Sequence, residues 1–328
     1  SLAVMWFGGK QVIAGGMLVG DFTAFLTYIT QILMSLMMLS MIMMMMTRSI
    51  ACGKRIIEVL DEQPSITDPA QPLTEVRDGS IDFNRVHFKY HTDGSGDDIL
   101  ENIDLHIRSG ETIGIIGGTG SGKTTLVNLI PRLYDAAEGE VLIDGKNVND
   151  FDAVALRRQI GIVPQKAVLF KGTIRQNLLW GREGATDEEL WTALDTAQAR
   201  EVVKSKENEL DALVEQGGVN FSGGQRQRLT IARALVRRPK ILILDDSASA
   251  LDYATDAALR MAIRNMPDAP TTFIVSQRAA SVRYADHIIV LDDGIIAGQG
   301  THDSLLESCA VYQEIYYSQF PREVNSHG

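Results

Sequence analysis

A glycine-rich stretch between an apolar run and a helix-forming run constrains this chain more than any other segment. Residues 117–125 read Gly-Gly-Thr-Gly-Ser-Gly-Lys-Thr-Thr and fit the pattern G-x-x-x-x-G-K-[ST]. The run at 112–116 predicts a buried strand before the loop, and residues 126–130 can continue a helix after it. With the elements in this order, the loop N–H groups and the positive end of the helix can surround a phosphate. An ordinary glycine-rich turn does not require a strand before it and a helix after it.

We therefore predict a nucleotide phosphate site at this loop. Lys123 is placed to reach the outer phosphates, and the Thr124 hydroxyl is placed to bind Mg²⁺. The loop residues predicted to bind the nucleotide are Gly117, Gly118, Thr119, Gly120, Ser121, Gly122, Lys123, Thr124 and Thr125.

The overall charge and the cysteine content narrow the function classes. A net charge of −11 at pH 7 argues against a nucleic-acid binder held by a broad basic face, so no nucleic-acid partner is expected. Cys52 and Cys309 are the only cysteines and lie far apart, and the six histidines show no ligand spacing. The sequence thus predicts neither a disulfide framework nor a cysteine metal site, which suits a reducing compartment.

The N-terminal part has the composition of membrane helices. Residues 22–47 contain no charged side chain, and a helix of that length is about 39 Å long, enough to cross a hydrocarbon core of about 30 Å. A buried helix of a soluble protein rarely avoids charge over so long a run. Basic residues follow at Arg48, Lys54 and Arg55, which places the C-terminal end of the span in the cytoplasm.

We interpret residues 1–60 as the end of a transmembrane domain. Its expected parts are a partial helix at 1–9, a glycine-containing turn at 11–20, a full span at about 22–47 and a cytoplasmic extension to residue 60. The sequence starts with Ser1 and is apolar from Leu2, so we expect a fragment whose upstream membrane helices are missing.

The remaining sequence alternates apolar strands with helical stretches, which indicates an α/β domain. We predict a proline-containing linker at 61–80, this domain at 81–320 and a tail at 321–328. Two early strands, one with a bulge, and a hairpin turn at Asp144-Gly145 are expected in its first part. The helix formers at about 171–237 predict an inserted helical subdomain.

Two further motifs have the composition of nucleotide sites. The apolar strand at 241–244 ends in Asp245 and Asp246, and an acid in that place can hold Mg²⁺ through water. Ser222-Gly223-Gly224-Gln225 stands at the start of a predicted helix, where it can cap the helix or bind a second anion. Two phosphate-type helix starts in one domain suggest that the second serves a nucleotide held by another copy.

As a set, these motifs resemble the C-terminal part of an ATP-binding cassette (ABC) exporter half-transporter over nearly the whole chain. The resemblance implies an α/β P-loop ABC ATPase domain with a mixed sheet core, a helical subdomain and an antiparallel β subdomain, preceded by a transmembrane α-helix. It implies ATP and Mg²⁺ as cofactors, with Tyr90 stacked on adenine and Gln165 sensing Mg²⁺ and the membrane domain. Ser222, Gly223, Gly224 and Gln225 match the family signature, with Phe221 in place of Leu, and Asp252 ends the D-loop at 249–252.

Two positions depart from the family pattern, and both belong to the same ATP site. Asp246 stands where a Glu normally polarises the attacking water, and its carboxylate is about 1.5 Å short, which can cost on the order of 100-fold in rate. Gln277 stands at the switch histidine and cannot become cationic. We interpret Asp246, Gln277 and Gln165 as the catalytic set of a degenerate site, with Thr124, Gln165 and Asp245 on the metal.

The resemblance implies partners and a location. Cassettes of the family pair head to tail, so we expect a heterodimer with a second half-transporter that carries Glu and His at the two positions. The alternatives are a homodimeric exporter with slow hydrolysis and a regulatory half that holds nucleotide without turnover. The expected location is the inner (plasma) membrane, multi-pass, with a cytoplasmic ATP-binding domain and a small-molecule, lipid or peptide substrate. The apolar span and the acidity argue against a soluble cassette acting on DNA or ribosomes.

Overall fold

The computed structural model of the chain describes residues 2–90, 98–247 and 250–320. It divides into two compact units, one up to Ser65 and one from Ile66 onward. The predicted tail at 321–328 lies outside the described residues.

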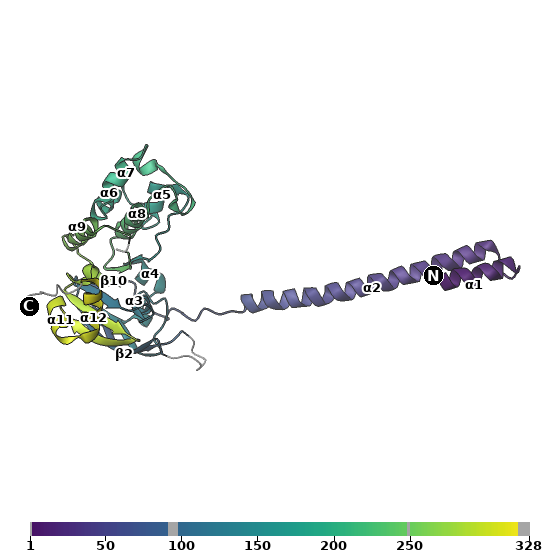
Figure 1. Cartoon of the computed structure of the whole chain (residues 1–328), viewed down its shortest axis with the longest axis horizontal. Coiled ribbons are helices and arrows are strands. Elements are labelled where there is room, and N and C mark those ends of the chain that lie inside the picture. Colours follow the sequence, from purple (N-terminus) through teal and green to yellow (C-terminus); the bar gives the residue numbers. More distant parts are fainter. Residues whose placement is uncertain (1, 91–97, 248–249, 321–328) are drawn as a thin grey trace, which may run out of the picture. The chain divides into compact units, whose positions relative to one another are not determined.

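The first unit consists of two helices, α1 (Leu2–Ile13) and α2 (Val19–Leu60). The chain turns at Gly15, whose φ is +72°, and α1 lies along the beginning of α2 (Figure 1). A Cβ on Gly8 would come within 2.3 Å of the Phe22 ring, so glycine allows α1 to approach α2 at this point.

The helix expected at 1–9 therefore extends further in the structure, to Ile13, and the turn expected at 11–20 is shorter. Gly8 and Gly9 lie inside α1, because a glycine within a helix costs only about 1 kcal/mol relative to alanine. The span predicted to start at residue 22 begins three residues earlier, at Val19.

Among the described residues, α2 is the helix whose length and apolar composition allow it to cross a membrane. Six of its hydroxyl side chains donate hydrogen bonds to backbone carbonyls three or four residues earlier in the same helix. These residues are Thr23, Thr27, Thr30, Ser35, Ser40 and Thr47. A polar group satisfied within its own helix can face an apolar environment at little cost.

The second unit is built around a six-stranded mixed sheet. In spatial order its strands are β12 (Ile295–Gly300), β11 (His287–Asp292), β3 (Thr112–Gly117), β10 (Thr271–Ser276), β9 (Ile241–Asp245) and β6 (Ile160–Val163). The strands from β11 to β6 are parallel, and β12 is antiparallel to β11. Their carboxyl ends therefore meet along one edge, where ligands of open α/β sheets bind.

Two smaller sheets accompany the main one. An antiparallel four-stranded sheet has the order β2 (Leu100–Ile107), β1 (Ile81–Phe88), β4 (Glu138–Ile143) and β5 (Lys146–Asn147). The predicted bulge is present between Phe83 and Val86, and the predicted hairpin turn has positive φ at Asp144 and Gly145. The remaining pair is β7 (Gly172–Thr173) with β8 (Leu213–Val214).

Helices cover the sheets and form the inserted part. The inserted helices are α5 (Ile174–Leu179), α6 (Asp187–Thr196), α7 (Arg200–Lys204) and α8 (Gly223–Val236), which lie together in Figure 1. The others are α3 (Lys123–Leu129), α4 (Ala153–Arg158), α9 (Tyr253–Arg264), α10 (Ala279–Val282), α11 (His302–Ser308) and α12 (Ala310–Gln319). Short 3₁₀ segments are η1 (Val148–Asp150), η2 (Glu209–Asp211) and η3 (Gln216–Gly218).

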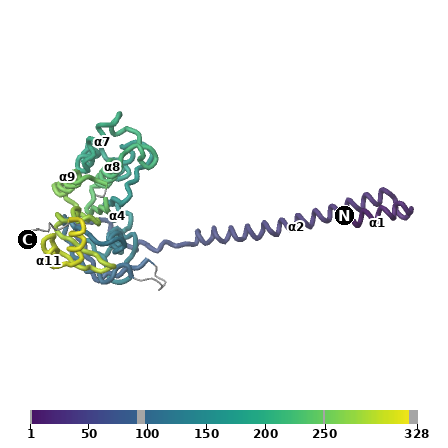
Figure 2. Tube along the Cα trace, in the orientation of Figure 1, coloured from purple at the N-terminus to yellow at the C-terminus, as the bar shows by residue number. Residues whose placement is uncertain are grey.

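The main sheet separates two hydrophobic cores because successive side chains of a strand point to opposite faces. In β9, Ile241 and Ile243 face the core shared with the antiparallel sheet and α3. Leu242 and Leu244 face the core shared with the inserted helices and α12. In the Cα trace of Figure 2, the C-terminal segment carrying α11 lies at the opposite end of this unit from α7.

The later part of the predicted linker packs on the second unit. Leu73 forms a bridge with Phe151, and Val76 is buried. The carboxylate of Asp144 accepts hydrogen bonds from the backbone N–H groups of residues 77–80. This segment is thus held beside the hairpin at the end of β4.

Candidate nucleotide site

The glycine-rich loop joins β3 to α3 and leaves no room for side chains at two of its glycines. A Cβ on Gly117 would lie 2.1 Å from the Leu291 carbonyl oxygen, and one on Gly122 would lie 2.7 Å from a Leu100 methyl. Gly120 and Gly122 also have φ of +84° and +92°, a conformation that L side chains rarely adopt. Glycine is required here for both space and backbone conformation.

Lys123 begins α3 and is buried within the loop. Its ammonium donates to the Gly117 carbonyl at 3.1 Å and to the Ser121 hydroxyl at 3.3 Å. Burial lowers the pKa of Lys123, while the charges of Asp245 and Asp246 act in the opposite direction. A cation held by loop oxygens, with two carboxylates near enough to raise its pKa, is placed to receive phosphate oxygens.

Thr124 and Asp245 form the oxygen pair expected of a Mg²⁺ site. The Thr124 hydroxyl lies 3.1 Å from each carboxylate oxygen of Asp245, at the end of β9. Burial raises the pKa of Asp245, and the Thr124 hydrogen bond opposes that rise. The described residues contain no cluster of three or more His, Cys, Asp or Glu side chains fit for a metal. Asp245 supplies a carboxylate and Thr124 a hydroxyl oxygen, so this pair fits Mg²⁺, which proteins usually hold through one or two carboxylates together with substrate phosphates.

The two unusual residues, Asp246 and Gln277, lie in the same pocket as the loop. The Gln165 side-chain amide donates to an Asp246 carboxylate oxygen at 3.3 Å. Asp246 follows β9 and donates its backbone N–H to the Val275 carbonyl at 2.9 Å. Gln277 follows β10, the neighbouring strand in the sheet. Sheet order thus brings together side chains that lie far apart in the sequence.

The pocket has a volume of about 390 Å³. It is lined by Tyr90, Ile99, Thr119, Gly120, Gly122, Lys123, Thr124, Thr125, Gln165, Asp245, Asp246, Val275, Ser276 and Gln277. A concave site with a lysine, two carboxylates and an aromatic ring can hold a Mg²⁺-bound nucleotide.

Tyr90 lies just beyond β1 and is half exposed. Its hydroxyl is 2.9 Å from the Thr125 hydroxyl. Its ring meets Phe88 and Tyr134 edge to face, with centroids 4.9 Å and 5.2 Å apart. Two aromatic neighbours hold the ring in place, which favours stacking on a planar base.

Sequence reasoning missed several neighbours of the nucleotide pocket. Ile99, Val275 and Ser276 line it, and Tyr134 supports Tyr90 from outside the lining set. Val275 and Ser276 could have been found from their position at the end of a buried strand. Nothing in the sequence pattern distinguishes Tyr134, because its contact with Tyr90 depends on how the antiparallel sheet packs against α3.

The signature residues are separate from this pocket. The Ser222 hydroxyl caps α8 by accepting from the Gln225 N–H, and the Gln225 side-chain oxygen accepts from the Ser222 N–H. A Cβ on Gly224 would lie 3.1 Å from the Ala250 carbonyl oxygen. Gly223 instead lines a hollow that also includes Gln165.

Asp252 caps α9, accepting from the Thr255 N–H at 2.9 Å and from its hydroxyl at 2.8 Å. These hydrogen bonds, the backbone one first, lower the pKa of Asp252. Residue 249 of the predicted D-loop lies outside the described residues. Neither Asp252 nor the signature touches the chain's own nucleotide pocket.

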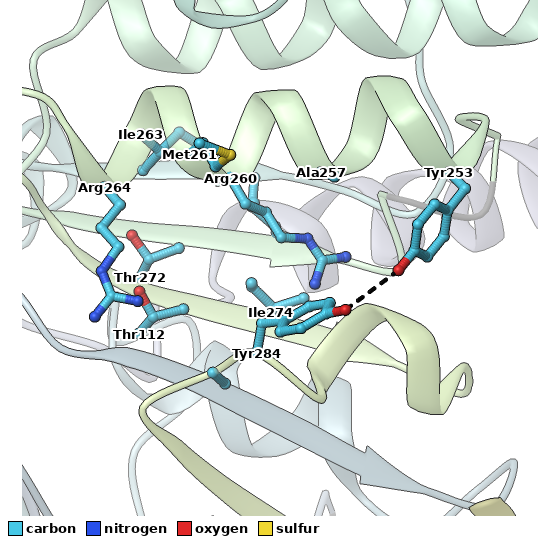
Figure 3. A pocket seen from close by; sticks show the side chains of 12 residues that line it. Thr112, Tyr253, Ala257, Arg260, Met261, Ile263, Arg264, Thr272, Ile274 and Tyr284 are labelled. Atoms are coloured by element: carbon cyan, nitrogen blue, oxygen red, sulfur yellow. Dashed lines mark hydrogen bonds between the residues drawn. The ribbon is translucent and has the colours of Figure 1, made fainter. Parts of the chain in front are cut away.

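A second pocket of about 460 Å³ lies between α9, α10 and the main sheet (Figure 3). Tyr253 and Tyr284 point toward each other there, with their hydroxyls 3.4 Å apart. Most of its wall is apolar, and it shares no lining residue with the nucleotide pocket.

Comparisons with known proteins agree with this geometry. Residues 100–249 match the family described as ABC transporter. The chain is 42% identical over 322 residues to the uncharacterised ABC transporter ATP-binding protein YfiB of Bacillus subtilis, covering 98% of this chain and 55% of that protein. It is 37% identical over 318 residues to the ATP-dependent lipid A-core flippase of Desulfotalea psychrophila, covering 96% and 55%.

The fold also matches a solved structure of a bacterial Atm1-family ABC exporter with ATP bound. The TM-score is 0.77 at 33% identity, over 93% of this chain and 53% of that one. The chain therefore carries an ABC transporter ATP-binding domain, preceded by an apolar helix, and the predicted fold class is confirmed. The chain spans about half the length of the relatives it matches.

Proposed function

We propose that this chain is the ATP-binding and ATP-hydrolysing subunit of an ABC exporter that moves substrate out across a membrane. The nucleotide pocket supports the ATPase part, and the similarity to a flippase and an exporter supports the transport part. The length and apolar composition of α2 support a membrane location, and we propose that this is the inner (plasma) membrane, with the ATP-binding domain in the cytoplasm. The multi-pass arrangement belongs to the same proposal.

The proposal of a degenerate ATP site rests on one observation: Asp246 and Gln277 line the same pocket as Lys123. The Asp246 side chain, which is shorter than Glu, accepts a hydrogen bond from the Gln165 amide. Gln277 can offer a γ-phosphate only a neutral amide. Such a site is suited to bind Mg²⁺-ATP and unsuited to activate the attacking water. We infer that ATP stays bound at this site for a long time and is hydrolysed only slowly.

The placement of the signature supports a dimer, and the departures at Asp246 and Gln277 favour a heterodimer over a homodimer. Ser222 and Asp252 lie outside the chain's own pocket, where they are free to complete a site on a partner's loop. We propose that the partner carries Glu and His at the two positions and that turnover occurs at the site which this chain's signature completes. The transported substrate would be a small molecule, lipid or peptide.

An experiment on trapped nucleotide tests this function. The purified full chain, in detergent, is incubated with Mg²⁺-ATP and separated from free nucleotide, and the bound nucleotide is analysed. We expect the bound nucleotide to be mostly ATP and not ADP, because this site is expected to bind ATP and to hydrolyse it slowly. Steady conversion to ADP by the chain alone would instead favour a homodimeric exporter with a working site. A chain that traps ATP but stays inactive with every partner half-transporter would favour the nucleotide-holding regulatory role.

Tyr90 provides a prediction about adenine binding. We expect Tyr90→Ala to weaken ATP binding roughly 5- to 150-fold, because base stacking contributes about 1–3 kcal/mol. Tyr90→Phe keeps the ring but loses the bond to Thr125, so its ATP affinity should stay within about threefold of the wild type. Calorimetric titration measures both. An equal loss in the two variants would assign the effect to the hydroxyl, and no loss in Tyr90→Ala would exclude stacking.

A further inference from the structure

One side chain at the end of the last described helix holds both sides of the turn that carries Gln277. The Gln319 side-chain nitrogen donates to the Gln277 carbonyl at 2.8 Å. The Gln319 side-chain oxygen accepts from the Ala279 N–H at 2.9 Å. Both hydrogen-bonding ends of one amide thus bind the backbone of residues 277–279.

This turn has few other restraints of its own. Arg278 is the N-cap of α10, yet its side chain makes no capping hydrogen bond. The first N–H groups of a helix need acceptors from outside the helix, and Gln319 supplies one for Ala279. Ser276 supplies another bond, accepting from the Arg278 N–H at 3.0 Å. The backbone between β10 and α10 is therefore held partly by α12.

Helix α12 is anchored well enough to act as that support. Tyr312 is fully buried, and its hydroxyl lies 2.8 Å from His302 Nδ1. Burial raises the pKa of Tyr312 to about 12 and lowers the pKa of His302, which favours the neutral form of both groups. Near the end of the helix, the rings of Tyr316 and Phe320 lie 4.9 Å apart on either side of Gln319 in the sequence.

We propose that Gln319 is a positioning residue of the nucleotide site, which holds the turn at 277–279 so that Gln277 faces the γ-phosphate of bound ATP. The proposal rests on the proposed function. It follows from a contact between residues far apart in the sequence, since β10 ends inside the nucleotide pocket and α12 packs beside α10. Through this contact the C-terminal helix takes part in distinguishing ATP from ADP, which lacks the γ-phosphate.

The test uses the purified full chain and two readouts. In Gln319→Leu both hydrogen bonds are lost at similar side-chain size, and Gln319 is exposed, so the core is not disturbed. Without nucleotide, we expect amide hydrogen exchange of residues 277–282 to become roughly fivefold faster. The ratio of ATP affinity to ADP affinity should fall by roughly threefold or more, because Gln277 is no longer held toward the γ-phosphate.

Gln313→Leu is the matched control. Gln313 lies on the same helix and donates to the Leu306 carbonyl at 2.8 Å, away from the nucleotide pocket. We expect it to leave exchange at 277–282 and the affinity ratio unchanged. Gln319→Glu retains the acceptor for Ala279 and loses the donor to Gln277, so intermediate values are expected for both readouts.

Three results would overturn the proposal. Unchanged exchange at 277–282 in Gln319→Leu means that the side chain does not hold the turn. Faster exchange with an unchanged affinity ratio means that the contact does not affect the preference for ATP over ADP. Equal changes in Gln313→Leu assign the effect to the stability of α12. If the wild-type chain binds no ATP, the proposed function fails, while the exchange measurement still decides whether Gln319 holds the turn.

Discussion

Changing Asp246 to Glu and Gln277 to His together is expected to raise ATP hydrolysis by the purified chain about 100-fold. The longer Glu side chain moves a carboxylate by about 1.5 Å toward the attacking water, and a displacement of about 1 Å can change rates on the order of 100-fold. The imidazole adds a group that can bear positive charge beside the γ-phosphate. Phosphate release at saturating Mg²⁺-ATP measures the effect.

The single variants are expected to gain less than the pair, because both residues act on the same reaction and their effects are not additive. Asp246 has φ of +44°, a left-handed conformation that Asp tolerates better than Glu. Asp246→Glu should therefore lower the Tm slightly even as the rate rises. A double variant that binds ATP but hydrolyses it no faster than the wild type would contradict the degenerate-site proposal.

Asp292→Glu combined with Gln299→His is a matched control, since both residues are exposed and outside the nucleotide pocket. It should leave hydrolysis unchanged. Adding Lys123→Ala to the active-site pair should abolish the gain, which ties the new activity to this pocket.

Lys123→Ala is expected to weaken ATP binding on the order of 100-fold. The ammonium can form charge-assisted hydrogen bonds to phosphate, each contributing about 1.5–3 kcal/mol. Its loss also leaves Asp245 and Asp246 without the nearby cation, so their charges repel the phosphates. Calorimetric titration with Mg²⁺-ATP measures the change in affinity.

Lys171→Ala removes an exposed lysine that does not line the nucleotide pocket, and serves as the control. Its ATP affinity should equal that of the wild type. An ATP affinity of Lys123→Ala within twofold of the wild type would exclude the loop as the phosphate site. A lower Tm in Lys123→Ala without nucleotide would point instead to a structural role for the lysine.

The elements that local pattern predicted well are those whose geometry is set by neighbouring residues. The strand, glycine loop and helix around Lys123 formed as expected, because Gly120 and Gly122 adopt backbone angles that few other residues allow. The hairpin at Asp144 and Gly145 formed for the same reason. The helix expected to end at residue 9 was wrong, because Gly8 lies inside α1 and makes room there for Phe22 of α2.

The residue roles assigned to the site remain predictions, but their grouping in space is a property of the structure. Spacing and residue type identified the phosphate loop, the paired acids and the two departures at Asp246 and Gln277. Only the sheet order, with β10 between β3 and β9, places Gln277 in the pocket of Lys123. No periodicity in the sequence encodes that order, because strand pairing depends on burial over the whole unit.

The phosphate loop was evident from its residues because its function depends on backbone angles within a few positions. The bond from Gln319 to the turn of Gln277 was not, because it joins the end of α12 to the end of β10 across the folded unit. Tertiary packing brings these segments together by burying Tyr312 and the sheet strands in one core. That packing, and not any local pattern, connects the C-terminal helix to the nucleotide pocket.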